Sequence, residues 1–496
     1  MNSTAPSLFP PPFRRRVFSG KSGEGWQKQV LTHLIRPLVL ALVLAAGTAF
    51  GTSRVLTQFP EPGGGAISKM AIDSTRAILY VSGTFTSLGG KPRSSLAAIS
   101  LTSGAVLPWN PGIVGIIRAL AVDPATGIVY LGGNFTSIGG IPRRNLAAIT
   151  AAGMVVAGWD PQPDLAVISL AHFGSRLYVG GYFTNIGGEA VPYFAALNAN
   201  DAQVIGTFLP QPNSQVETIV ANASGLWAGG AFTTIGGVSR AKLASINPNT
   251  GVAYGGFSQT ISSGIISEVV AGTDLNVLYA TGNISTINGD SHFGGFAAFA
   301  SPTGTLQSWN PIGFGSIPPA APGTLTTVGG NIYLGGKFSE VGGEVRINLA
   351  AIDPGANTTD WAPTVDGQVF SMAAYGSTIF VSGTFTMVDG VARNGFAAIN
   401  DSNLGPPLKP LLVPTLRAKG TLKPRTTKSK ITLRGTATDA TLVEFSAGRG
   451  GFKPAGGTPS NWKIPVRLKS PKTVVNVRAT GPGGVSPLLK FTIRRK

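Results

Sequence analysis

One repeated position in this sequence carries side chains that could bind an anion. It lies eight residues after a recurring apolar anchor, and it holds Arg93, Arg143, Val191, Arg240, His292, Arg346 and Arg393. A guanidinium group can bind a carboxylate through two parallel hydrogen bonds. The five arginines and the histidine are therefore candidates for a cationic ring that takes an acidic glycan or another anionic polymer. In the competing interpretation each guanidinium binds backbone carbonyls of its own loop or of the next repeat. We expect this structural role, because a residue that recurs with every repeat usually serves the repeat.

The sequence offers few residues for catalysis. Its three histidines are His33, His172 and His292, and none has a serine or aspartate partner that the sequence assigns. The chain has no cysteine, which excludes disulfides, thiolate metal sites and a cysteine nucleophile. We therefore expect no catalytic residues, no metal ion and no cofactor.

Four carboxylates keep an enzymatic alternative open. They lie in or near the same loops as the recurrent arginines, at Glu189, Asp290, Glu340 and Asp389. Glycosidases use paired carboxylates as acid, base or nucleophile. These four follow no acid/base pattern, so solvated loop charges are the simpler interpretation. A secreted carbohydrate-active enzyme, either a hydrolase or a lyase, is the alternative function.

A repeat of about 50 residues must position these side chains. Its anchors are 50, 48, 49, 52, 54 and 47 residues apart, at Phe85, Phe135, Phe183, Phe232, Ile284, Phe338 and Phe385. In the second unit, four strand-like segments follow one another at 117–123, 127–135, 144–150 and 154–160. Four short strands joined by glycine-rich turns are typical of one propeller blade. The period therefore predicts an all-β fold of the propeller type.

A second series of aromatic residues gives the number of blades. The fourth segments carry six of them, at Trp109, Trp159, Phe208, Phe257, Trp309 and Trp361. The seventh is at the other end of the repeats, because Phe59 precedes Asp73 by fourteen residues, as Trp109 precedes Asp123. We predict that 54–59 pairs as the outer strand of the last blade. This pairing would close a seven-bladed propeller over residues 54–405 and remove its open sheet edges.

Two stretches carry a family resemblance. They are "IYLGGKFSEVGGEVRINLAAID" (332–353) and "IFVSGTFTMVDGVARNGFAAIN" (379–400). Both resemble delta-60 repeats of bacterial β-propellers, and the double glycine with a later Trp is also similar to kelch repeats. The resemblance covers about 350 of the 496 residues. It implies the propeller fold in an exported or surface protein, and it implies no activity. The fifth unit departs from the pattern, with Ile284 in place of the usual Phe.

The N-terminal segment 1–51 predicts export. It contains the apolar run "LVLALVLAAGTAF" (38–50), which is too short to span a bilayer and fits the core of a signal peptide. Small residues at Ala49 and Gly51 offer a cleavage site near 51. We expect a secreted or cell-surface protein with no transmembrane segment in the mature chain. An uncleaved membrane anchor is the alternative.

Positive charge is concentrated at the C-terminal end. Residues 410–496 hold 18 Lys/Arg and two acids, whereas residues 55–409 hold 14 and 18. After a Pro-rich linker (406–416), alternating strands are predicted at 429–438, 441–447, 461–468, 472–480 and 488–495. The run "NWKIPVRLKSPKTVVNVRATGPGGVSP" (461–487) resembles bacterial immunoglobulin-like modules, which implies a small β-sandwich over 417–496.

This charge predicts attachment to an anionic partner. An exported basic domain fits adhesion to acidic polysaccharide or to lipid headgroups of an envelope. Nucleic acid is not expected, because it conflicts with export and with the sparse aromatic residues. A basic face that only solubilises the domain is the competing interpretation. We therefore expect an exported, non-catalytic propeller protein for surface attachment or recognition, and the sequence leaves its oligomeric state open.

Overall fold

The computed structural model describes two stretches of the chain. They are residues 53–404, apart from 257–258, 263, 285, 292–294, 302 and 310–322, and residues 415–495, apart from 420–424, 428–429, 439–441, 448–451, 469, 482–483 and 486–488. The predicted leader (1–51) lies outside the described residues, as does the predicted linker up to residue 414.

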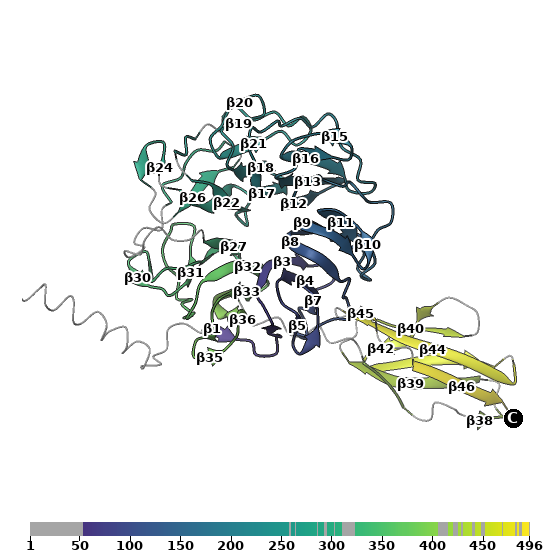
Figure 1. The fold of residues 1–496 in the computed structure, drawn as a ribbon. Helices are drawn as coiled ribbons and strands as arrows, with labels where there is room; N and C mark the ends of the chain where they lie inside the picture. The colour runs from purple at the N-terminus through teal and green to yellow at the C-terminus, as the bar shows by residue number, and fades with distance from the viewer. Residues whose placement is uncertain are drawn as a thin grey trace, which may run out of the picture. The chain divides into compact units, whose positions relative to one another are not determined.

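Residues 53–404 form antiparallel sheets that follow one another along the chain (Figure 1). The first strands of these sheets are β3 (Ile67–Asp73), β8 (Ile113–Val122), β12 (Val167–Phe173), β17 (Val216–Asn222), β22 (Ile266–Ala271), β27 (Thr324–Val328) and β32 (Val369–Tyr375). Each of these strands contacts the first strand of the next sheet, and β32 contacts β3. The first strands therefore surround a common centre, which is the arrangement of a β-propeller.

Two further strands complete most sheets. The second strands are β4 (Ile78–Gly83), β9 (Val129–Ile138), β13 (Arg176–Gly181), β18 (Gly225–Gly230), β23 (Val277–Gly282), β28 (Asn331–Gly335) and β33 (Thr378–Gly383). The third strands are β7 (Leu96–Ser100), β11 (Leu146–Ile149), β16 (Phe194–Asn198), β21 (Leu243–Ile246), β26 (Phe296–Ala300), β31 (Leu349–Ile352) and β36 (Phe396–Asp401). A 3-10 turn, η1 (Ser402–Leu404), follows the last of them.

The predicted fourth strands are shorter than expected. In the second repeat the segment 154–160 contributes one isolated bridge, between Val155 and Ile149. The chain then turns so that the Trp159 ring packs against Tyr130 at 5.2 Å, and its Nε1–H donates to the carbonyl of Ala199 in the next repeat. Strand pairing ends early here because the segment leaves the sheet, and the Trp159 side chain packs between two sheets.

The sheet formed by β32, β33 and β36 gains its outer strand from the start of the described chain. β1 (Ser53–Val55) pairs antiparallel with β36, with Val55 opposite Ile399. Farther along, the Phe59 ring contacts the Phe380 ring edge-on at 5.2 Å. The sequence analysis expected 54–59 to pair as an outer strand here; the paired strand spans 53–55, and residues 56–59 lie beside the last repeat through other contacts.

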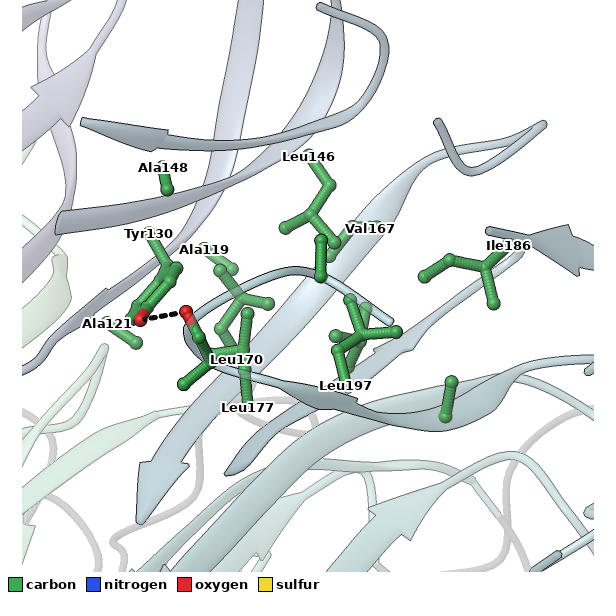
Figure 2. Packing of buried hydrophobic residues seen from close by; sticks show 14 of the residues in the cluster. Ala119, Ala121, Tyr130, Leu146, Ala148, Val167, Leu170, Leu177, Ile186 and Leu197 are labelled. Carbon is green, nitrogen blue, oxygen red and sulfur yellow. Dashed lines mark hydrogen bonds between the residues drawn. The ribbon is translucent and has the colours of Figure 1, made fainter. Parts of the chain in front are cut away.

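Packing between neighbouring sheets depends on small residues. Figure 2 shows the cluster between the second and third repeats, where Tyr130 and Leu146 meet Val167 and Leu170 of the next sheet. At Gly229, a β-carbon would lie 2.6 Å from Cγ2 of Ile266 in the next repeat. Glycine in the second strand therefore permits the close approach of the following sheet.

The loops from second to third strands form small hairpins, which turn at a double glycine in five repeats and at Asn288-Gly289 and Asp389-Gly390 in the other two. In the second repeat Gly139 and Gly140 have φ values of 58° and 76°, which favour glycine. The short strands of these hairpins are β2 (Pro62–Gly63) with β5 (Ser87–Leu88) and β6 (Lys91–Pro92), β10 (Ile141–Pro142), β14 (Asn185–Ile186) with β15 (Glu189–Ala190), β19 (Thr234–Ile235) with β20 (Val238–Ser239), β24 (Thr286–Ile287) with β25 (Asp290–Ser291), β29 (Glu340–Val341) with β30 (Glu344–Val345), and β34 (Met387–Val388) with β35 (Val391–Ala392).

The C-terminal residues form a two-sheet sandwich with its own core. One sheet has the order β37 (Thr415–Ala418), β39 (Lys430–Thr438), β43 (Asn461–Arg467) and β42 (Gly456–Thr458). The other comprises β38 (Arg425–Thr426), β46 (Leu489–Arg495), β44 (Lys472–Gly481), β40 (Leu442–Ala447) and β41 (Lys453–Pro454), with β45 (Gly484–Val485) beside β44. Trp462 and Ile464 of the first sheet pack with Val477 and Phe491 of the second. β37 begins at Thr415, inside the segment predicted as linker.

Candidate functional site

Four of the five recurrent arginines bind backbone carbonyls within their own repeats. In each of Arg93, Arg143, Arg240 and Arg346, Nη1 donates to the carbonyl of the preceding residue, at 2.7 to 2.9 Å. Nη2 donates to a carbonyl shortly before the aromatic residue of the fourth segment. In the first repeat this bond runs from Arg93 to Leu107 O at 2.6 Å, two residues before Trp109. These contacts join the hairpin loop to the outer segment of the same repeat. They match the structural role expected for this position.

Arg393 makes the same contact to a segment from the other end of the described chain. Its Nη2 donates to Phe59 O at 2.7 Å, and its Nη1 lies 3.1 Å from Glu61 Oε1. The second carboxylate oxygen of Glu61 accepts from the Asn394 N–H. Arg393 is 4% exposed, and this burial lowers the pKa of its guanidinium while Glu61 raises it. The arginine thus ties residues 59–61 to the last repeat.

The other residues at this position differ in their burial and in their charged neighbours. Arg143 is 8% exposed and has an acidic neighbour, with Nη1 3.5 Å from Asp160 Oδ2. Arg93, Arg240 and Arg346 are half-buried. Val191 is buried, and His292 lies outside the described residues.

The four carboxylates do not come together as one described site. Glu189 lies in β15, Glu340 in β29 and Asp290 in β25, which belong to hairpins of different repeats. The side chain of Asp290 is outside the described residues. Asp389 accepts a hydrogen bond from the Thr364 N–H at 2.7 Å. Among the described residues, no group of three or more histidine, aspartate or glutamate side chains is placed to hold a metal ion.

His172 occupies an inter-repeat packing position. It lies in β12, and its ring stacks on Tyr130 of the preceding repeat at 5.6 Å. Burial lowers the pKa of His172, and the nearby Asp123 carboxylate partly offsets this. These contacts fit the place of His172 in the first-strand series.

A second set of cations lies on one face of the C-terminal sandwich. Along β39 and β43, inward apolar residues alternate with outward residues, as in Trp462, Ile464 and Val466. The outward residues form the cationic sheet face, which we define as Arg417, Lys430, Thr432, Arg434, Thr436, Lys463, Pro465 and Arg467. Its five cations are exposed, and its described residues include no aspartate or glutamate.

The register places like charges directly opposite one another on this face. Lys430 is paired with Arg467, and Arg434 is paired with Lys463. Like charges at directly opposed positions of an antiparallel pair destabilise the sheet. An open hollow is lined by Lys430, Thr432, Pro465 and Arg467, together with Ile431 and Val466. The cationic sheet face therefore has the chemistry of an anion-binding surface.

The opposite sheet differs in its charge pattern. Its outward residues include Glu444, which pairs with Arg478 at 2.9 Å, and Arg478 also lies 4.0 Å from the centre of the Phe452 ring. Lys472 and Lys490 are exposed on this sheet as well, and Lys472 is directly opposite the exposed Arg494. The two faces therefore differ in their acids, because the described outward residues of the first sheet include none, and this difference was missed in the sequence analysis. The strict alternation in "KITLRGT" (430–436) and "WKIPVR" (462–467) is the signal that could have revealed it.

Comparison with known proteins gives little beyond this geometry. No family model matches the chain, and no curated protein matches it. The crystal structure of the computationally designed Ika8 protein is 11% identical over 69% of this chain and 98% of its own, with a TM-score of 0.43. The β-propeller domain of Cps50 (Swd1) from Myceliophteria thermophila is 10% identical over 71% of this chain and 99% of its own, with a TM-score of 0.47. At these TM-scores neither likeness adds to what the sheet topology shows.

In the part of the chain that the structure describes, no helix has the length and apolar character needed to cross a bilayer.

Proposed function

We propose that this chain is an exported, non-catalytic protein that attaches to an anionic polysaccharide of a cell surface through the cationic sheet face. The observation that carries this proposal is a sheet face with five exposed cations, two directly opposed like-charge pairs and no described acid. Natural sheets usually avoid such pairs because they lower stability. A polyanion offsets the repulsion when it binds, so the cost is recovered only in the complex.

The architecture in this proposal is a seven-bladed propeller followed by an immunoglobulin-like sandwich. Support for a closed ring comes from the contact of β32 with β3, the pairing of β1 with β36 and the bond from Arg393 to Phe59 O. Support for the second domain comes from its two packed antiparallel sheets and the core around Trp462. In this proposal the sandwich attaches the propeller to the surface. Export rests on the apolar run at 38–50.

The test compares two variants of equal net charge. Arg434→Thr/Lys463→Thr removes one opposed pair from the cationic sheet face, and Lys453→Thr/Lys490→Thr removes two exposed cations of the other sheet that are not opposite a cation. The full chain is retained on immobilised polygalacturonate over a series of salt concentrations. We expect the first variant to elute at lower salt than the second, and to unfold at the same denaturant concentration as the wild type or a higher one, because repulsion has been removed.

Two results would contradict this function. Equal loss of retention in both variants would mean that net charge alone acts, and no retention of the wild type at low salt would remove the polysaccharide as partner. Release of new reducing ends from the polymer by the wild type would instead favour the carbohydrate-active enzyme.

A further inference from the structure

Three neighbouring repeats carry unusual side chains near the start of their first strands. Six of these strands have a register shift directly after their first buried aliphatic residue, and the residue at the shift is Ser68, Arg118, Ile168, Glu217, Ser267 or Phe370. Bulges of this kind redirect a side chain and often occur beside functional sites. Only Arg118 and Glu217, in the second and fourth repeats, carry a charge at this position.

The third repeat lies between them and departs from the pattern at a second position. The residue before its apolar anchor is Tyr182, whereas the other repeats hold Thr84, Asn134, Ala231, Asn283, Lys337 and Thr384 there. The Tyr182 N–H donates to Ala166 O, which fixes it beside the start of β12. Its ring is 43% exposed, and the preceding turn leaves Leu165 52% exposed. Tyr182 and Leu165 are thus two exposed apolar side chains near the start of β12.

Charges from both neighbouring repeats act on Tyr182. The Tyr182 hydroxyl donates to Glu217 Oε1 at 3.3 Å, which is long for an O–H···O bond and leaves the carboxylate able to accept from another donor. Burial and Glu217 raise the pKa of Tyr182, whereas the nearby Arg118 guanidinium lowers it. Arg118 is exposed. The Tyr182 hydroxyl therefore contacts an acceptor of the next repeat, and its pKa also responds to a cation of the preceding repeat.

We propose that Tyr182, Arg118 and Glu217 form a binding site for an acidic sugar residue of a polysaccharide. The apolar face of the sugar ring would lie on Tyr182, Glu217 would accept its hydroxyl groups, and Arg118 would bind its carboxylate through two hydrogen bonds. A residue that recurs with every repeat serves the fold, but three departures that converge from consecutive repeats serve something specific to this place. This site rests on the proposed function, to which it adds sugar recognition by the propeller.

The experiment uses hexagalacturonate as probe and cellohexaose as its neutral counterpart. Binding is followed by isothermal titration at high salt, in the full chain that carries Arg434→Thr/Lys463→Thr, so that the cationic sheet face contributes little. We expect hexagalacturonate to bind more tightly than cellohexaose. Tyr182→Ala and Arg118→Gln should each weaken hexagalacturonate at least about tenfold, and Glu217→Gln should weaken both probes. The matched control is Phe370→Ala, because Phe370 is 44% exposed at the same level of the seventh repeat.

The outcomes separate this site from the proposed function. Unchanged affinity in Tyr182→Ala, equal loss in Phe370→Ala, or no binding of hexagalacturonate to this chain would overturn the sugar site. None of these results changes the retention of the wild type on polygalacturonate, which depends on the cationic sheet face. Unfolding curves that coincide for Tyr182→Ala and its parent chain would show that the loss is one of binding.

Discussion

The seam between residues 53–61 and the last repeat can be tested with one pair of substitutions. Phe59 is 3% exposed and packs with Leu56, Phe380 and Phe396. Replacing a buried Phe by Ala in a packed core lowers the free energy of unfolding by about 3–5 kcal/mol, because apolar burial is lost and a cavity remains. Phe370→Ala makes the same chemical change at an exposed position and should cost no more than about 0.5 kcal/mol.

The assay is equilibrium unfolding of the full chain in urea, followed by far-ultraviolet circular dichroism. We expect Phe59→Ala to lower the midpoint without changing the slope, since the surface exposed on unfolding stays the same. A double-mutant cycle with Phe380→Ala should give a coupling of about 0.5–1.5 kcal/mol for the edge-on ring pair. Deleting 54–60 should lower the midpoint further. If Phe59→Ala behaves like Phe370→Ala, the segment does not pack against the last repeat and the seam is absent.

Three further predictions concern the polar groups of the propeller. Arg143→Gln/Arg346→Gln should lower the unfolding midpoint and leave retention on polygalacturonate unchanged, because both guanidinium groups bond within their own repeats. Lost retention with an unchanged midpoint would instead favour an anion-binding ring of recurrent arginines. Tyr333→Phe should lower the free energy of unfolding by about 1–3 kcal/mol, because the Tyr333 hydroxyl donates to the fully buried Asp401 at 2.7 Å. Tyr80→Phe is the control and should lower it less, because no described residue hydrogen-bonds the Tyr80 hydroxyl. Equal losses in the two variants would argue against the Asp401 contact. Burial raises the pKa of Glu268 above its ordinary 4.5. The native state therefore binds this proton more tightly than the unfolded state, and stability falls as the pH rises from 4.5 through the raised pKa. Glu268→Gln should flatten that part of a plot of unfolding midpoint against pH, and an unchanged slope would contradict the raised pKa.

Much of the architecture was accessible from the sequence because each repeat carries its own local signals. The aromatic series that runs from Trp109 to Trp361 predicted which residues would pack, and Tyr80–Trp109 and Tyr333–Trp361 are in ring contact at 4.9 and 5.0 Å. The absence of a seventh member predicted the role of Phe59. The fourth strands were wrong in length, because periodicity shows that a segment is apolar and cannot show how soon it leaves the sheet. The strand β37 was missed because the prolines before it favour a linker.

Some features of the candidate sites could likewise be predicted from the sequence, whereas others required the structure. Alternation of polar and apolar residues along 430–436 and 462–467 fixes which side chains share a face, since a strand has a period of two. Only the register could place Lys430 opposite Arg467, because pairing depends on how two distant strands align. The partners of the recurrent arginines also required the structure. A guanidinium reaches whatever the folded chain brings near it, and for Arg393 that is Phe59, which is 334 residues away along the chain.

The sequence by itself determined the repeat, the small residues that let sheets approach, and the segregation of charge toward the C-terminal end. These properties are local, so composition and spacing record them directly. The tertiary structure decided which carbonyl each arginine binds, where like charges oppose one another, and that Tyr182 contacts Glu217 of the next repeat. These two residues are 35 apart along the chain, and their side chains come together because neighbouring sheets pack around a common centre.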